Sequence, residues 1–468
     1  MNRNQQSSQL LVVFGLVVLL GGLCPSLAQA DAARVQGLGG ARLFTEDPSF
    51  VFTNPAQLGE HGNRLWFSLG ITGGEGALGL DPHGGGAVRI KEVVSLGVAL
   101  NRSPLLYGFD AAIWPVTLAY MPEGPGGPLE GPEVSSDSSA PLRFPLDLLL
   151  SFGDSSSKLR FGLNFYYAGG RSRSWDIDDS DQDDLEQSDR VDLQTHLFNV
   201  TLGLSGGTRA DRRRGELWLR VGNMSSWRDA LSTVESSEGV VDSVLDQILT
   251  MDRNLRLGLG GRLKLGDGGQ GLLVSPAFSY DLALGDFRFE DNLVVPSSRA
   301  ENSERQVRAH DARLGVGVSY RRQGLLVQGS LAARLALTEF TDLIDLGLGD
   351  YQRNARQAWD LRLPELSLGA EYELLPWLLI RAGMRSSVVG GISLSSLNQG
   401  VGAPDASVDF SASQELSAAP AEVHMDASFG LGFRHKGFAL DAILGGLFLG
   451  EGVAPQLLSR VDMSFSFD

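Results

Sequence analysis

The sequence predicts an all-β protein, a transmembrane antiparallel β-barrel of 14 to 16 strands, and two observations carry that prediction. At the end of the chain, Val461, Met463, Phe465 and Phe467 alternate strictly with polar residues. A closing strand that is apolar on one face, polar on the other and aromatic at its end is typical of outer-membrane barrels. In addition, segments of about ten residues with the same alternation recur along the chain, separated by Gly, Asp, Ser and Pro clusters.

The first thirty residues have the pattern of an export signal. An apolar run at residues 10–20 is followed by a small-residue cleavage site at residues 28–30. The run is about half the roughly 20 residues that a membrane-spanning helix needs. We therefore expect residues 1–30 to be a signal peptide and the mature chain to begin at Asp31. Because Cys24 is the one cysteine, we expect neither a disulfide nor a thiolate site after cleavage.

The composition narrows the class further. Glycine makes up about 13% of the chain (59 of 468), against roughly 7% on average, which suits an all-β protein with bends and closely packed strands. The net charge of −17 argues against nucleic acid as a partner, because phosphate binding needs clustered Lys and Arg. The longest apolar stretch after the signal, residues 437–450, is broken by Asp441. A closed barrel is therefore the structure expected to span a membrane.

Alternation is clearest in residues 158–167, 254–264, 313–321 and 423–434. If the apolar sets face lipid, the charges between them face a lumen, since Arg or Lys facing lipid at mid-depth costs roughly 2 to 4 kcal/mol. Two interpretations of these charges remain open, namely cross-strand salt bridges, or an electropositive path for the carboxylate of an amphiphile. The predicted lumen-facing charges are Arg160, Arg256, Arg262, Arg313, Arg321, Arg334, Arg381, Arg434 and Asp426.

Sixteen strands are expected to begin near residues 64, 86, 108, 143, 158, 191, 214, 253, 270, 306, 324, 359, 375, 422, 437 and 457. Fourteen also remains possible, because prolines fall inside four expected strands, where each removes a ladder hydrogen bond. These prolines are Pro115, Pro145, Pro276 and Pro364. Short connections alternate with long ones such as 169–190 and 389–421, as expected for periplasmic turns and extracellular loops.

Two of the expected long loops have further features. The acidic stretch 176–184 lacks the glycine and glutamate that an EF-hand needs at its sixth and twelfth positions, where Asp181 and Gln187 stand. We interpret it as a solvated loop. The apolar spacing in residues 227–251 allows either an amphipathic helix or a loop that packs on itself.

A glycine-rich segment and an Asn-Pro-Ala box follow the expected cleavage site, and the motif residues are Gly37, Gly39, Gly40, Asn54, Pro55 and Ala56. The order of these elements resembles the N-terminal signature of the long-chain fatty acid transporter (FadL-like) family and its relatives. The resemblance covers about 20 of 468 residues. The chain departs from the family at Gln57, where glycine is usual, and at Asp468, which stands after the terminal aromatic residue.

The resemblance implies a domain organisation and a function. Residues 31–63 would form a small N-terminal plug, or hatch, inside a barrel of residues 64–468, and hydrophobic molecules would pass from an extracellular site to a lateral opening. The Asn54-Pro55 pair favours turn initiation, which suits a plug. The other interpretation of the box is that it only initiates the first strand.

We therefore expect a channel in the bacterial outer membrane for hydrophobic or amphiphilic small molecules. Its other expected partners are outer-membrane lipid and the barrel-assembly machinery, with a protein partner also possible. The alternatives are an outer-membrane scaffold or export-assembly partner, or a porin for small polar solutes. We expect no catalysis, cofactor or metal: His424, Asp426 and Ser428 lie side by side on one strand face, about 6.5 Å apart, and cannot converge as a triad requires.

Overall fold

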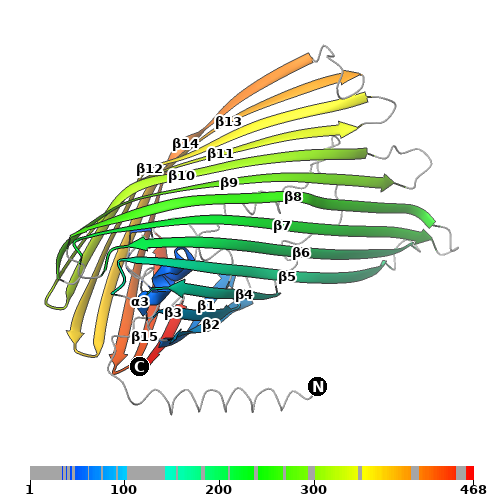
Figure 1. The fold of residues 1–468 in the computed structure, drawn as a ribbon. Coiled ribbons are helices and arrows are strands. Elements are labelled where there is room, and N and C mark those ends of the chain that lie inside the picture. The colour runs from blue at the N-terminus through cyan, green and yellow to red at the C-terminus, as the bar shows by residue number, and fades with distance from the viewer. Residues whose placement is uncertain are drawn as a thin grey trace, which may run out of the picture.

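Sixteen antiparallel strands close into one barrel in the computed structural model (Figure 1). The structure describes residues 34, 38, 43–44, 48–61, 63–74, 77–90, 93–102, 143–153, 156–180, 185–208, 211–236, 241–266, 270–293, 301–345, 350–401, 411–448 and 460–467. The expected signal peptide, Gly37, Gly39, Gly40 and Pro115 lie outside these residues. Among the described residues, no helix is long and apolar enough to cross a membrane.

The strands follow one another around the barrel in chain order, and β1 closes it against β16, with Asn63 opposite Phe467 and Gly70 opposite Arg460. Their bounds are β1 Asn63–Gly74, β2 Ala77–Ile90, β3 Val94–Leu100, β4 Arg143–Phe152, β5 Leu159–Ser180, β6 Leu185–Gly206, β7 Arg213–Ser236, β8 Val241–Gly266, β9 Gly271–Leu293, β10 Glu301–Arg322, β11 Leu325–Asp345, β12 Asp350–Leu375, β13 Leu378–Val401, β14 Ser411–His435, β15 Phe438–Phe448 and β16 Arg460–Phe467. The expectation of an all-β barrel with an even strand number is confirmed, and the number is sixteen.

Short turns join the strands at one end of the barrel, which we call the turn end. The connection between β10 and β11 consists of Gln323 and Gly324, with φ values of 47° and 79°. Positive φ at both residues defines the tight hairpin turn whose twist matches that of paired strands. The connections from β4 to β5, β6 to β7, β8 to β9 and β12 to β13 are also short and lie at this end, which identifies it as the periplasmic one.

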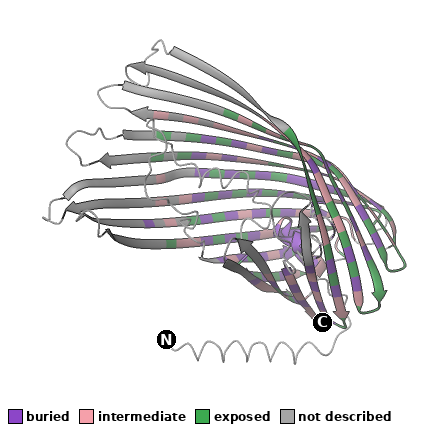
Figure 2. Ribbon diagram, turned by 180° about the vertical axis from the view of Figure 1, so that it is seen from behind, coloured by how far each residue is buried: buried purple, intermediate pink, exposed green. Residues whose placement is uncertain are grey.

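The two faces of the wall differ as the alternation predicts (Figure 2). Along β5, Leu159, Phe161 and Phe165 are exposed while Arg160 and Asn164 are buried. In β8, Leu255, Leu257, Leu259 and Leu263 are likewise exposed, and the charges between them are buried. Exposed leucine on a barrel wall marks the face that meets lipid, so the polar side chains line the interior.

A row of polar side chains crosses the outer face of β9 to β12 and marks the upper border of the apolar band. Asp286 lies opposite Gln306, and Glu339 lies between Arg308 and Gln357, which donates a 3.0 Å hydrogen bond to it. From Arg322 to Arg308, β10 rises about 35 Å at 3.3 Å per residue and a tilt of about 40°, enough to span the apolar band of an outer-membrane barrel.

The strands from β5 to β14 continue well beyond this border, because they contain 21 to 26 residues each, whereas β15 and β16 contain 11 and 8. The wall is consequently tall on one side and low around β15 to β4 (Figure 1). The expectation of long loops at 169–190 and 389–421 was therefore largely wrong. Where both faces of a strand meet water, alternation disappears from the sequence and an extended hairpin is indistinguishable from a loop.

Three other expectations need correction or placement. The possible amphipathic helix at 227–251 is wrong, because its described residues pair as β7 and β8. A strand at Val94–Leu100 was not expected, and the strand expected near 108 lies outside the described residues. Asp176–Ser180, from the acidic stretch, forms the end of β5.

Pro276 pairs with Val316 in regular register, whereas the other two described prolines of the four fall at irregular places in the ladder. Pro145 and Pro364 lie within register shifts, between Arg143 and Leu146 and between Arg362 and Glu365. Bulges of this kind accommodate a residue that has no N–H to donate.

The outer wall makes a direct prediction. Replacing Leu257 by Arg should destabilise the barrel by about 2 to 4 kcal/mol, because a guanidinium would face hydrocarbon. Gln306→Arg, in the polar row beside Arg308, is the matched control and should change stability little. The measurement is urea unfolding of the protein folded in phospholipid vesicles; equal effects of the two substitutions would place the membrane elsewhere on the wall.

Candidate functional site in the lumen

The lumen at the turn end contains a compact segment, which we call the plug segment and define as residues 48–61. It consists of the 3-10 helices η1 (Pro48–Phe52) and η2 (Pro55–Gln57) and the short helix α3 (Leu58–His61). Asn54 caps η2, with its Oδ1 accepting a hydrogen bond from the Ala56 N–H at 3.2 Å, and Pro55 begins the helix. Proline is favoured in a first helical turn because its missing N–H would have no helical partner there.

The Asn-Pro-Ala box lies directly on the barrel wall, where two strands carry glycine. A Cβ atom at Gly162 of β5 would lie 2.1 Å from the Ala56 nitrogen, and one at Gly203 of β6 would lie 2.2 Å from Asn54 Oδ1. Asn54 also donates a 3.2 Å hydrogen bond from Nδ2 to the Leu204 carbonyl. The backbone of the box approaches so closely because these positions lack side chains.

Gln57 forms the polar centre of the contact between the plug segment and the wall. Its Nε2 donates a 2.5 Å hydrogen bond to Oε1 of Glu216, a buried carboxylate on β7. Arg262 and Lys264, both on β8, each lie 2.7 Å from the same carboxylate. Gln57, which departs from the family pattern, therefore completes the coordination of a charge that is already paired.

Aromatic rings hold the other face of the plug segment. Phe50 packs edge-on against Trp218, with ring centroids 5.5 Å apart, and lies 4.0 Å beneath the Arg262 guanidinium. Phe52 lies 4.6 Å from the guanidinium of Arg102, which forms a paired salt bridge with Asp147 at 2.5 and 2.6 Å. Such cation–π contacts stabilise most when they are shielded from water, as here.

The predicted lumen-facing charges lie in these surroundings, and most of them are paired. Arg160 is buried and pairs with Glu60 of the plug segment. Pairs across the wall join Arg256 to Asp281 at 3.1 Å, Arg313 to Glu365 at 2.6 Å, Arg334 to Asp311 at 2.7 Å, and Arg381 to Glu371 at 2.7 Å and to Asp441 at 2.5 Å. The geometry thus favours salt bridging over an electropositive path, since these cations are neutralised at short range.

Three other predicted charges are only partly buried or are exposed. Arg434 is partly buried, 4.0 Å from Glu371. Arg321 is half-buried near the turn end. Asp426 is exposed, and its register partner Arg385 pairs with Glu365 at 2.6 Å instead.

Sequence reasoning missed several residues that hold the lumen together. Arg34, which precedes the plug segment, pairs with Glu371 at 3.0 Å. Trp218 was also missed, although it occupies an inward position in a strand, as Tyr166 does. A large aromatic residue in the polar phase of such a strand is the signal that could have identified it.

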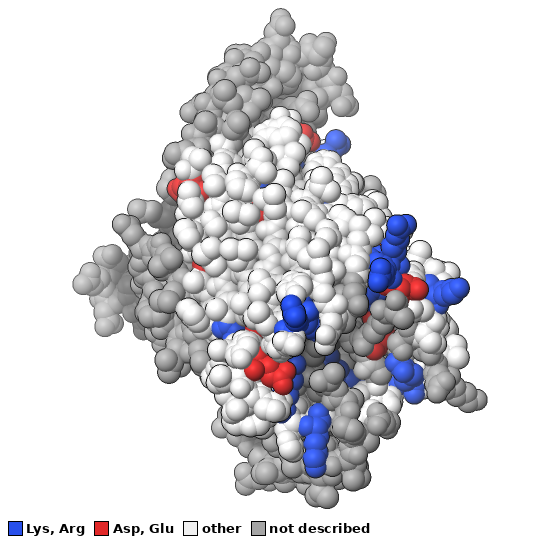
Figure 3. Space-filling view, turned by 90° about the vertical axis from the view of Figure 1, so that its left-hand side faces the viewer, with Lys and Arg blue, Asp and Glu red and all other residues white. Residues whose placement is uncertain are grey.

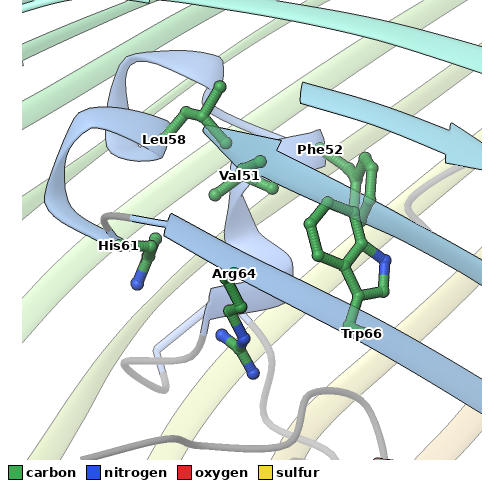
Figure 4. Close-up of a pocket in the computed structure, with 7 residues that line it drawn as sticks. Val51, Phe52, Leu58, His61, Arg64 and Trp66 are labelled. Carbon is green, nitrogen blue, oxygen red and sulfur yellow. The ribbon is translucent and has the colours of Figure 1, made fainter. Parts of the chain in front are cut away.

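An apolar pocket lies between the plug segment and the strands β1 and β2 (Figure 4). Val51, Phe52 and Leu58 line it from the plug segment, and Trp66 and Ala87 from the wall. His61 and Arg64 complete the lining. Trp66 Nε1 is buried with no hydrogen-bond partner among the described residues.

The described residues contain no cluster of three or more His, Cys, Asp or Glu side chains that could hold a metal. On β14, the His424 Nε2 atom lies 3.6 Å from the Glu422 carboxylate, and both side chains are exposed.

The fold and this site define a closed, sixteen-stranded antiparallel barrel with a short helical segment in its lumen. No family model and no curated protein matches the chain. Among solved structures, the chain is similar to the "TodX deltaS2S3 mutant monoaromatic hydrocarbon channel", with 13% identity, 94% of this chain and 99% of that chain covered, and a TM-score of 0.41.

Two further solved structures are similar to the chain over most of its length, at similarly low identity. The CymD monoaromatic hydrocarbon channel has 13% identity, covers 94% of this chain and 98% of its own, and gives a TM-score of 0.35. The ferric yersiniabactin uptake receptor FyuA from Yersinia pestis has 8% identity, with 87% and 80% covered and a TM-score of 0.36. Values this low carry no argument about substrate.

The close contact between the Asn-Pro-Ala box and the wall predicts that one methyl group added at Gly162 displaces the plug segment. Gly162→Ala should displace the plug segment, so that the amides of Thr53 and Asn54, which donate to the Phe50 carbonyl, exchange faster with deuterium, by about tenfold for each 1.4 kcal/mol of lost local stability. Gly390→Ala is the control, because a Cβ there meets nothing within 4 Å. Unchanged exchange in Gly162→Ala would show that the box does not rest on β5.

The hydrogen bond from Gln57 to Glu216 predicts which of two substitutions at position 57 loosens the plug segment more. Gln57→Gly, which restores the residue usual in the family, should loosen the plug segment by about 1.5 to 3 kcal/mol, as for a hydrogen bond to a charged group. Gln57→Glu should loosen it more, because it places a second carboxylate against Glu216. Hydrogen exchange of residues 48–61 measures both; a Gln57→Glu protein as protected as Gln57→Gly would contradict the contact.

Proposed function

We propose that this protein is an outer-membrane channel that lets hydrophobic or amphiphilic small molecules pass through a barrel closed at its turn end by the plug segment. The observation that carries the proposal is the narrow apolar pocket beside the plug segment, which has room for about one water molecule and would widen to admit a larger molecule when the plug segment moves. It is formed jointly by the plug segment and the wall, so any movement of the plug segment changes it.

The chemistry of the pocket supports this substrate class. Val51, Leu58 and Ala87 offer apolar surface, and the rings of Phe52 and Trp66 stand 6.2 Å apart at one side (Figure 4). The N–H of Trp66 could donate to the polar head of an amphiphile, because a ligand site typically combines apolar lining with a few polar groups. The pocket offers a polar solute few binding partners, because the charged side chains of the lumen pair with one another.

The plug segment also supports a gated channel over an open pore. It joins the wall through Arg160, Gln57 and the box, contacts that involve β5, β6 and β7. One wall residue stays neutralised when the plug segment leaves, because Glu216 keeps Arg262 and Lys264. Arg160 loses its pair with Glu60 and keeps the Ser205 hydroxyl at 2.9 Å.

Filling the pocket tests the proposal. In a porin-deficient Gram-negative host, Ala87→Phe should reduce uptake of the fluorescent probe N-phenyl-1-naphthylamine to the level of cells without the channel, because the new ring occupies the pocket. Val88→Phe, at the next residue on the lipid-facing side, should leave uptake unchanged.

Two results would contradict the proposal. Equal probe uptake with and without the wild-type channel would favour a scaffold. Rapid swelling of proteoliposomes in arabinose, unchanged on deletion of residues 31–62, would favour a porin.

A further inference from the structure

A groove crosses the outer, lipid-facing side of the wall over β5 to β10 and encloses about 880 Å³, including space open to the surroundings. Its lining is almost entirely apolar. Facing residues in the pairing register define its course, from Leu159 to Gly206 and Gly215 near the turn end, and through Gly261 to Phe278 and Leu314. Five strand spacings correspond to about 24 Å, comparable with a long acyl chain.

The groove is hollow because glycine occupies outward positions where neighbouring strands carry leucine. A Cβ atom at Gly206 would meet nothing nearer than 3.9 Å, and one at Gly215 nothing nearer than 3.6 Å. Exposed Leu159, Leu217 and Leu263 form its sides. Gly261 is covered by Phe278 and Leu217, whereas Gly206 and Gly215 leave room that lipid must fill, since a void in hydrocarbon would forfeit dispersion contacts.

The groove slopes from the rim of the barrel at the turn end toward the middle of the membrane. Leu159 is the first residue of β5 and Gly206 the last of β6, so this end lies at the turns. Leu314 lies on β10, which ends at Arg322, and at 3.3 Å per residue and a tilt of about 40° it stands about 20 Å above the rim. A phospholipid has this arrangement, with its head group at the border and its chain toward the midplane.

Basic side chains stand at the rim end of the groove. Lys158, Arg212 and Arg213 are exposed, and the Lys158 carbonyl accepts the Gly207 N–H at 2.7 Å, which fixes the turn beside Gly206. Asp211 is the one exposed carboxylate among the described residues of the same turns, so basic side chains outnumber acidic ones among those residues. Figure 3 shows Lys and Arg side chains standing out from this end of the molecule.

We propose that this groove binds one acyl chain of an anionic phospholipid from the periplasmic leaflet, with the lipid phosphate at Lys158, Arg212 and Arg213. The shape of the groove suits an acyl chain, and the basic residues at its rim suit a head group with negative charge. This site lies outside the lumen, so it stands or falls separately from the proposed transport function.

Native mass spectrometry of the full-length protein, released from detergent, tests the site with added phosphatidylglycerol and with phosphatidylcholine of the same chains. One phosphatidylglycerol should bind more tightly than phosphatidylcholine. Arg213→Gln should weaken phosphatidylglycerol binding about fivefold, as expected for one basic residue near an anionic lipid. Arg322→Gln, also an exposed arginine at the turn end, should leave binding unchanged.

Filling the groove separates shape from charge. Gly206→Leu combined with Gly215→Leu should abolish tight binding of both lipids, whereas Gly329→Leu on β11, outside the groove, should not. Heat-modifiable gel mobility verifies that each barrel is closed, and Gly215→Ala, which makes only an ordinary contact with Leu263, serves if the double variant does not fold. Equal binding of the two lipids to the wild-type protein, or undiminished binding to the filled groove, would overturn the proposal.

Discussion

The pairing of charges inside a closed cylinder is the constraint on which the rest of this structure depends. Closing the sheet satisfies the backbone hydrogen bonds along the ladders, and the lipid outside forces charged side chains inward. Inside, each guanidinium needs a carboxylate, because an unpaired buried charge costs several kcal/mol. Glu371 shows the result, since it joins Arg381 of the neighbouring strand to Arg34, far away at the start of the described chain.

The same pairing of polar groups holds the plug segment against the wall. Its backbone reaches the wall where Gly162 and Gly203 leave space, and its polar side chains complete pairs that the wall has already begun. The low side of the barrel, from β15 to β4, includes the strands β1 and β2 that line the apolar pocket beside the plug segment.

Much of the barrel could be predicted from the sequence, because a strand in a bilayer must alternate. Residues 158–167 and 254–264 assigned their two faces correctly, and the inward arginines were identified before their partners were known. The extensions of β6 to β8 beyond the membrane border could not be predicted, because water on both faces removes the alternation. The partners of the charges could not be predicted either, since register across strands, as between Glu216 and Arg262, is not visible along one strand. The glycines at 162 and 203 acquire their meaning only from the segment that lies against them.

The most direct test of this account asks which medium touches each face of one strand. Nitroxide labels at Leu314 and Val318 of β10, and at Arg313 and Ser319 on either side of them, can be compared in lipid vesicles by their collisions with oxygen and with a water-soluble nickel complex. The account predicts that oxygen, which concentrates in hydrocarbon, relaxes the first two labels more than the second two, and that the nickel complex does not reach the first two. The same response to oxygen and nickel at all four positions would contradict it.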